Sequence, residues 1–150
     1  MGLESIFKVN GSAMTAQMLR MEVHSSNIAN INATRTPEGG PYRRKEVVFE
    51  AKPVNQSFEE TLSAASQGAN ANTAVGVEVV SVVEDPSPFK RKFDPSHPDA
   101  GPDGYVMFPN VEVVSEMVDI QEAARAYEAN ISVILATKNM IAKTFEIGRR

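Results

Sequence analysis

The side chains best suited to chemistry gather in one short segment, Phe93–Gly104. It contains three aspartates and a histidine: Asp94, His97, Asp99 and Asp103. Imidazole and carboxylate groups are suitable metal ligands, but their spacing here does not match a calcium-binding loop. Prolines and glycines fill much of the segment and describe a shaped turn equally well. We therefore expect a turn here, and no metal site.

The other histidine, His24, lies inside an apolar periodic segment near the N-terminus. We expect it to be a partly buried polar residue or to lie at an interface, and not to be catalytic. No nucleophile elbow and no phosphate-binding glycine motif occurs in the chain. It also has no cysteine, which excludes disulfides, thiol catalysis and thiolate metal sites. This inventory predicts a protein that is not an enzyme and holds no cofactor, with a small hydrolase using Asp94–Asp103 as an alternative.

Bulk properties exclude further classes. The chain has 150 residues, a formal charge of -4 and 42% hydrophobic residues, which suits one domain or a small domain with a protruding element. The basic clusters Arg43–Lys45 and Lys90–Lys92 are too short for a nucleic-acid surface. We expect them to be solvated loops, or alternatively to dock an acidic neighbouring subunit. No apolar run is long enough to insert in a membrane, and no cleaved signal peptide is expected.

The C-terminal segment carries an apolar heptad stripe, which predicts a long helix that needs another helix to cover it. As one helix, Val113–Phe145 is about 50 Å long, too long for the core of this chain to enclose. We expect part of the covering surface to lie on other molecules. Asn110 or Ser115 is the expected N-cap, and Lys138 is the one polar interruption. The stripe consists of Val113, Met117, Ile120, Ala124, Tyr127, Ile131, Ile134, Ile141 and Phe145.

The N-terminal segment predicts a second helix, roughly Leu3 to Ile31. Turn-forming residues and Pro37 end it. Its apolar face consists mainly of Leu3, Phe7, Met14, Met18, Met21 and Ile28. Residues 35–110 hold all nine prolines and three strand-like runs, Lys45–Glu50, Val75–Val83 and Tyr105–Phe108.

The sequence therefore predicts an α+β fold. Two long terminal α-helices pack as a coiled-coil-like helical domain of residues 1–34 plus 111–150. A small antiparallel β-rich insertion of residues 35–110 lies between them. Within the insertion, residues 55–73 are rich in Ser, Ala, Asn and Gln, which predicts a mobile loop.

Asparagines inside the two helical patterns are a further signal, because asparagine is a poor helix former. Asn27 and Asn30 lie in the first helix, and Asn130 lies in the second. Amides at contacts between helices fix register at some cost in stability. We expect these amides, with the Pro37–Tyr42 turn, to take part in subunit packing together with the apolar stripes.

Several of these motifs resemble the bacterial flagellar rod and hook family. Ser26–Asn30 reads Ser-Asn-Ile-Ala-Asn, which resembles the N-terminal signature of that family. The turn that follows, Thr34–Arg44, is longer than in most members and is similar to that of the proximal rod proteins. Gly104–Asp119 and Ala124–Asn130 are similar to the C-terminal motif of the family. Two long motifs in the right order cover well over half the chain, together with the turn Phe93–Asp99.

The resemblance implies a structural subunit whose terminal helices pack with those of other copies and of other rod and basal-body proteins. It implies export through the flagellar type III apparatus without a cleaved signal, a periplasmic position in the basal body, transmission of torque and a share of the export conduit. Another axial subunit and a non-flagellar coiled-coil adaptor stay as alternatives.

Overall fold

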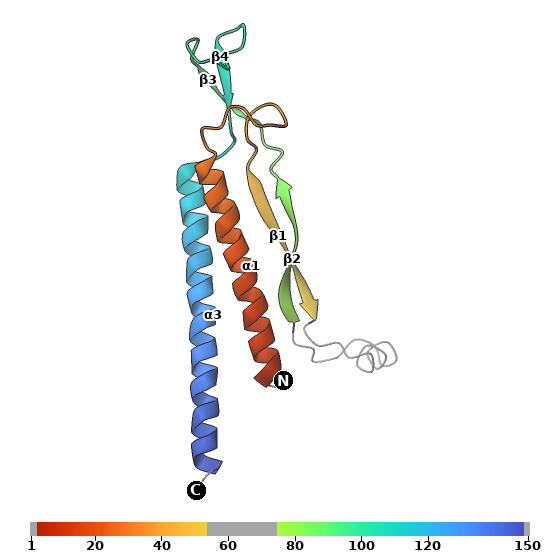
Figure 1. The fold of residues 1–150 in the computed structure, drawn as a ribbon, viewed down its shortest axis with the longest axis vertical. Helices are drawn as coiled ribbons and strands as arrows, with labels where there is room; N and C mark the ends of the chain where they lie inside the picture. The colour runs from red at the N-terminus through yellow and green to blue at the C-terminus, as the bar shows by residue number, and fades with distance from the viewer. Residues whose placement is uncertain (1–2, 54–74, 149–150) are drawn as a thin grey trace, which may run out of the picture. The chain divides into compact units, whose positions relative to one another are not determined.

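The computed structural model describes residues 3–53 and 75–148. It contains two helices, α1 (Leu3–Ala29) and α3 (Val113–Gly148), and four strands between them (Figure 1). The strands are β1 (Lys45–Pro53), β2 (Val75–Glu84), β3 (Lys90–Phe93) and β4 (Tyr105–Phe108). The predicted α+β class, with terminal helices around a small antiparallel insertion, is confirmed. The mobile loop predicted at 55–73 lies outside the described residues.

Helix α1 ends two residues earlier than predicted. Its last turn is closed by a hydrogen bond from the Asn30 N–H to the Ser26 carbonyl, and Ile31 N–H then bonds Ile28 in a tighter turn. Gly11 lies inside the helix and does not interrupt it. Neither α1 nor α3 contains a stretch apolar enough to cross a membrane, within the residues described.

Helix α3 begins at Val113. The prediction that Asn110 is its N-cap is therefore wrong. The first intrahelical bond runs from Glu116 N–H to the Glu112 carbonyl. The Asn110 side chain instead accepts a hydrogen bond from the Arg44 N–H at 2.9 Å and donates to the Asp85 carbonyl at 3.3 Å. Asn110 is therefore a tertiary link between distant segments. The alternative cap, Ser115, lies inside the first turn of the helix.

The strands form two separate two-stranded sheets, β1–β2 and β3–β4. β3 pairs antiparallel with β4, so that Lys92 lies opposite Val106 and Phe93 opposite Tyr105. The prediction that Lys90–Lys92 is a solvated loop was half right. The three residues are exposed to solvent, but they form a strand and not a loop. Three consecutive cations show no strand preference, and long-range pairing with the apolar β4 makes them a strand.

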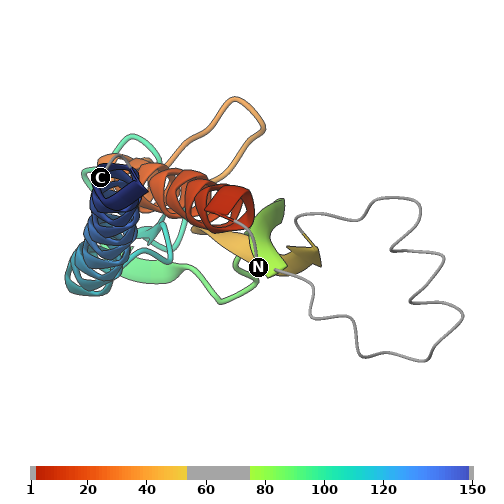
Figure 2. The same ribbon diagram turned by 90° about the horizontal axis from the view of Figure 1, so that it is seen from below.

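The chain forms two compact units, and each contains pieces of helix and of strand. The first comprises residues 1–18, 49–80 and 124–150, and the second comprises residues 19–48 and 81–123. In the first unit, the N-terminal end of α1 lies beside the β1–β2 ribbon (Figure 2), and the Val77 N–H donates to Ser12 Oγ at 3.2 Å. The division into a helical domain and an insertion stays a prediction.

The inner face of α3 differs in detail from the predicted stripe. Its fully buried positions are Glu116, Ala123 and Thr137, which are spaced by one and two heptads. Ile120, Tyr127, Ile134 and Ile141 of the stripe are half-buried beside them, whereas Val113, Met117 and Phe145 are exposed. Lys138 is exposed as well, so it interrupts no buried surface. The heptad period was right, but small and polar residues occupy its innermost positions.

Candidate functional site

A cluster of five polar side chains, three of them buried, joins three segments of the second unit. We call it the polar junction, and it consists of His24 and Asn27 from α1, Arg44 from the segment before β1, and Glu116 and Asp119 from α3. Asn27 and Glu116 have no exposed surface, and His24 is 2% exposed. Buried polar groups are costly unless they are hydrogen-bonded.

Every hydrogen-bonding position of the Asn27 amide is used. Nδ2 donates to the Lys45 carbonyl at 2.8 Å and to Glu116 Oε2 at 2.9 Å. Oδ1 accepts from the Lys45 N–H and from the Tyr42 hydroxyl, both at 3.0 Å. An amide has two donors and two acceptor positions, so Asn27 is saturated. It connects α1 to α3 and to the start of β1.

Glu116 is the centre of the polar junction. Its Oε2 lies 2.6 Å from His24 Nδ1, and its Oε1 lies 2.5 Å from Arg44 Nε. Burial raises the pKa of this carboxyl, but the hydrogen bonds from Arg44, Asn27 and His24 lower it by more, so the net shift of the pKa is downward. Glu116 is therefore a charged group held inside the unit.

Arg44 neutralises this carboxylate. Burial lowers the pKa of its guanidinium, but the hydrogen bond and the charge of Glu116 raise the pKa by more. Its other nitrogens lie 3.5 Å from Asp119 Oδ2 and 3.8 Å from Asp85 Oδ2. Ser87 orders Asp85 in turn, because its hydroxyl and its backbone N–H both donate to Asp85 Oδ1. These two hydrogen bonds lower the pKa of Asp85.

The polar junction includes the only three-residue group in the described chain whose atoms are close enough to hold a metal. His24, Glu116 and Asp119 have ligand atoms within 4.8 Å of one another. However, Arg44 already supplies a positive charge to both carboxylates, and His24 is in direct hydrogen-bond contact with Glu116. This arrangement favours an internal ion-pair network over a cation site.

The turn after α1 is tied to the polar junction through Tyr42. Its N–H bonds the Ala33 carbonyl, and its hydroxyl bonds Asn27. Between these ends, Thr36 N–H bonds the Gly40 carbonyl. Gly39 and Gly40 have φ values of 92° and 80°, which side chains rarely adopt. The loop is thus closed on itself, with Pro37 exposed at its tip.

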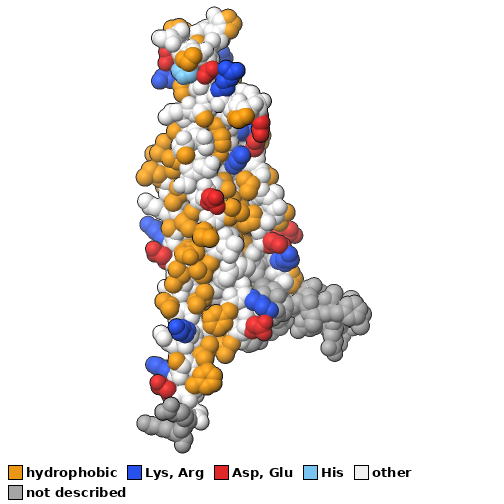
Figure 3. Space-filling view, in the orientation of Figure 1, with side chains coloured by type: hydrophobic (Ala, Val, Ile, Leu, Met, Phe, Trp, Pro, Cys, Tyr) orange, Lys and Arg blue, Asp and Glu red, His pale blue; other side chains and the backbone are white. Residues whose placement is uncertain are grey.

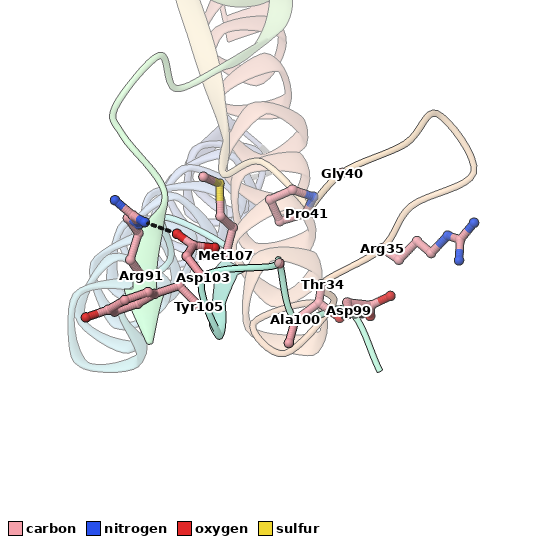
Figure 4. Close-up of a pocket in the computed structure, with 11 residues that line it drawn as sticks. Thr34, Arg35, Gly40, Pro41, Arg91, Asp99, Ala100, Asp103, Tyr105 and Met107 are labelled. Atoms are coloured by element: carbon pink, nitrogen blue, oxygen red, sulfur yellow. Dashed lines mark hydrogen bonds and ion pairs between the residues drawn. The ribbon is translucent and has the colours of Figure 1, made fainter. Parts of the chain in front are cut away.

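The Asp94–Asp103 segment is a turn whose polar groups bond within the turn and to neighbouring segments. His97 Nδ1 accepts from the Asp99 N–H at 3.1 Å. Asp99 accepts from the Thr34 hydroxyl at 2.8 Å, and Asp103 pairs with Arg91 at 3.0 Å. The turn lines a cavity of about 470 Å³, and Figure 4 shows the Arg91–Asp103 pair in its wall. Charged groups that pair with each other suit a structural turn better than a substrate site.

Comparison with known proteins decides what kind of molecule contains this junction. Residues 7–35 match the family described as flagella basal body rod protein, and residues 103–147 match the flagellar basal body rod FlgEFG protein C-terminal family. Flagellar basal-body rod protein FlgC of Borreliella burgdorferi is 44% identical, over 98% of each chain. The FlgC proteins of Bacillus subtilis and Salmonella typhimurium are 44% and 40% identical, over 94% and 99% of this chain and 95% and 100% of their own.

The chain belongs to the FlgC family of flagellar basal-body rod proteins. It is a structural subunit of the bacterial flagellar rod. The two matched regions of this rod subunit contain four of the five residues of the polar junction. His24 and Asn27 lie in the first region, Glu116 and Asp119 lie in the second, and Arg44 lies between them.

The predicted packing residues of the rod subunit fall into three groups by burial. Asn27 is buried and bonded within the chain. The exposed ones are Phe7, Met18, Pro37, Val113, Met117 and Phe145. The half-buried ones are Met14, Met21, Ile28, Asn30, Tyr42, Ile120, Ala124, Tyr127, Asn130, Ile131, Ile134 and Ile141. The structure brings Asn27 and Tyr42 together, whereas the amides of Asn30 and Asn130 bond the carbonyls of Ser26 and Ala126 in their own helices.

Sequence reasoning missed Arg44 and Glu116 as members of a site. The sequence places Arg44 in a short basic cluster, for which we expect a solvated loop, and Glu116 has no predicted role in a site. A signal for Glu116 was present, because it lies four residues before Ile120 and seven before Ala123, on the inner face of the helix. No comparable signal marks Arg44.

Proposed function

We propose that this rod subunit assembles through its two terminal helices. In this proposal the helices pack against those of other copies and other basal-body proteins in the periplasm. The assembled helices transmit torque and line part of the export conduit. The subunit reaches this position through the flagellar type III apparatus, and it is not an enzyme. A non-flagellar coiled-coil adaptor is disfavoured by the membership of the rod family.

The observation that carries this proposal is the exposed apolar surface of α3. Hydrophobic side chains follow the helix over much of its length (Figure 3). Beyond Thr137 the helix has no fully buried residue, and Phe145 and Ile147 are 75% and 77% exposed. Contiguous exposed apolar surface on a soluble chain marks an interaction site.

Helix α1 supports the same conclusion. Leu3, Phe7 and Met18 are 51%, 38% and 56% exposed. Five residues of α1 are buried, and four of them are polar, Ala16 being the fifth. The most deeply buried positions of α1 are thus mostly polar, while three of its large apolar side chains are exposed.

The polar junction acts on assembly indirectly. Asn27 and Glu116 have no exposed surface for a neighbouring subunit, so they contribute by holding the end of α1 against the start of α3. Removing one partner of such a network leaves a buried charge or amide unsatisfied. We infer that the junction sets the relative register of the two helices that neighbours recognise.

The decisive experiment changes Phe145→Ser and measures swimming and incorporation into purified basal bodies. Phe145 is exposed, so the soluble subunit should keep its fold and expression while incorporation fails. A matched control is Val82→Ser on β2, where another exposed apolar residue is changed outside the helices. The proposal would be contradicted if the Phe145 variant were incorporated normally, or if the Val82 control lost incorporation to the same extent.

A further inference from the structure

The β3–β4 hairpin of the second unit has one open strand edge. It is a two-stranded sheet, and within the described residues no further strand pairs with β3. The outer side of β4 is partly occupied, because the Tyr105 carbonyl accepts a hydrogen bond from the Gly101 N–H at 3.0 Å. All four residues of β3 are exposed. The open edge is therefore that of β3.

The pairing register shows which backbone groups face this edge. In an antiparallel pair, residues that bond the partner strand alternate with residues whose N–H and C=O point away from it. The Asp94 N–H bonds the Gly104 carbonyl across the pair at 3.0 Å, whereas the Tyr105 carbonyl bonds outward. Phe93, opposite Tyr105, and Arg91, two residues earlier, therefore direct their N–H and C=O to the open edge. Another strand can bond there without disturbing the hairpin.

One face of β3 carries two lysines. Side chains alternate across a strand, so Lys90 and Lys92 lie on the same face. The Lys90 Nζ donates to the Val111 carbonyl at 2.7 Å, and the Lys92 Nζ lies 5.8 Å from the ring centroid of Phe108. Neither lysine pairs with a carboxylate among residues 3–53 and 75–148. This face therefore presents positive charge beside the open edge.

The other face of the hairpin is apolar and exposed. The register sets Phe93 beside Tyr105 and Arg91 beside Met107. Phe93, Tyr105 and Met107 are 62%, 42% and 49% exposed. The one cation here, Arg91, already pairs with Asp103 at 3.0 Å and lies 4.9 Å from the centroid of the Tyr105 ring. The two faces thus call for different side chains on any strand that joins the edge.

We propose that the edge of β3 binds an extended segment of another protein in which acidic and apolar residues alternate. Directly opposite residues on neighbouring strands share a face. The acidic side chains then lie beside Lys90 and Lys92, and the apolar side chains lie beside Phe93. Main-chain hydrogen bonds supply the affinity of such strand addition, and the alternating side chains supply its specificity. This segment is the acidic neighbour that the basic cluster Lys90–Lys92 favours.

A second copy of β3 does not fit this edge. Pairing two β3 strands brings the three consecutive cations of each copy together, and like charges on neighbouring strands are destabilising. Lysines on an edge strand protect it against such self-pairing. The partner is therefore a different segment with the opposite charge. The inference goes beyond the proposed function, because it uses neither α1 nor α3.

The test measures binding of a short fluorescein-labelled peptide of alternating glutamate and valine to the full-length subunit. Fluorescence anisotropy should show binding that weakens as salt is added. The same peptide with lysine in place of glutamate should not bind. Lys92→Glu should lower the affinity by about fivefold, because an attractive pair becomes repulsive. Lys143→Glu changes an exposed lysine of α3 and should leave the affinity unchanged.

Two substitutions at Arg91 isolate the backbone contribution. Arg91→Pro removes the N–H at the open edge, where proline is tolerated because the hairpin does not use that donor. Arg91→Ala removes the same side chain and keeps the N–H. The proline variant should lose at least about tenfold in affinity. The alanine variant should stay within about twofold, because the ion pair with Asp103 is exposed. Circular dichroism checks that both variants fold.

The same variants test the edge in the cell. Arg91→Pro should impair swimming and incorporation into basal bodies, whereas Arg91→Ala should not. Strand addition is overturned by equal binding of the glutamate and lysine peptides, or by equal affinities of the two Arg91 variants. Normal swimming of a folded Arg91→Pro variant overturns the partner. If that variant does not fold, Lys92→Glu decides in its place, by peptide binding and by swimming.

Discussion

The side chain of Asn27 pairs with the backbone of Lys45 as a neighbouring strand would. Its Nδ2 donates to the Lys45 carbonyl at 2.8 Å, and its Oδ1 accepts from the Lys45 N–H at 3.0 Å. This pair of bonds fixes the start of β1 to the last turns of α1. Because the same amide also reaches Glu116, one residue aligns the strand with both helices.

Asn27→Ala should therefore destabilise the subunit by about 2–4 kcal/mol, because it leaves several buried polar groups without partners. Urea unfolding followed by circular dichroism measures the loss. Asn139→Ala removes an exposed asparagine from α3 and should change the free energy of unfolding by at most about 0.5 kcal/mol. Equal effects of the two changes would contradict the role given to Asn27.

The stability of the subunit should fall at acidic pH because of Glu116. Its pKa is lower in the folded chain than in the unfolded chain, so the unfolded state binds the proton more readily. Its contribution to stability is complete above the unfolded pKa, about 4.3 for a glutamate, and is lost as the pH falls through the lower folded pKa. Thermal unfolding between pH 7 and pH 3 should show this loss.

Glu116→Gln should remove that part of the acid dependence. At pH 7 it should also cost about 3–5 kcal/mol, because Arg44 loses a buried partner. Glu22→Gln, at an exposed position of α1, should leave the pH profile unchanged. An unaltered acid slope in the Glu116 variant would show that other carboxylates, such as Asp85, control the transition.

Gly104 should not tolerate a side chain. Its φ is 75°, and an added Cβ would lie 2.8 Å from Cε2 of Phe93. Gly104→Ala should destabilise the chain by about 1–3 kcal/mol. Gly11→Ala is the opposite case, because it lies in α1 with nothing within 4 Å of the added Cβ. Gly11→Ala should stabilise the folded chain by about 0.5–1 kcal/mol. Urea unfolding measures the change in the free energy of unfolding for both variants.

Ile131→Asp should abolish swimming and rod assembly while the protein is still expressed. Ile131 is half-buried on α3, and a carboxylate placed there meets apolar surface without a partner. Motility assays and isolation of basal bodies provide the readout. The neighbouring Ser132→Asp changes an exposed position and should be tolerated, so normal motility in both variants would contradict the packing role of Ile131.

Hydrogen exchange of the purified subunit should divide α3 into two parts. Residues 138–148 have no fully buried side chain, whereas Glu116, Ala123 and Thr137 are buried in the preceding segment. The backbone amides of residues 138–148 should exchange faster than those of the preceding segment, because unwinding this end of α3 exposes little buried apolar surface. Uniform protection to Gly148 in a verified monomer would argue against helix ends that await a partner.

The sequence by itself was enough to predict the two terminal helices, three of the four strands found in residues 3–53 and 75–148, and the family. These features depend on local periodicity, on turn residues and on motifs that occupy consecutive positions, such as Ser26–Asn30. β3 was not predictable, because Lys90–Phe93 becomes a strand only through its pairing with Tyr105–Phe108.

Only the tertiary structure decided which residues lie inside. The heptad of α3 was visible in the sequence, but its innermost positions are Glu116, Ala123 and Thr137. A buried charge cannot be recognised until its partners are known, and Arg44, Asn27 and His24 come from segments 72, 89 and 92 positions away. The physical reason is that burial of a polar group depends on hydrogen bonds supplied by distant residues, whereas helix and turn signals lie within a few neighbouring positions.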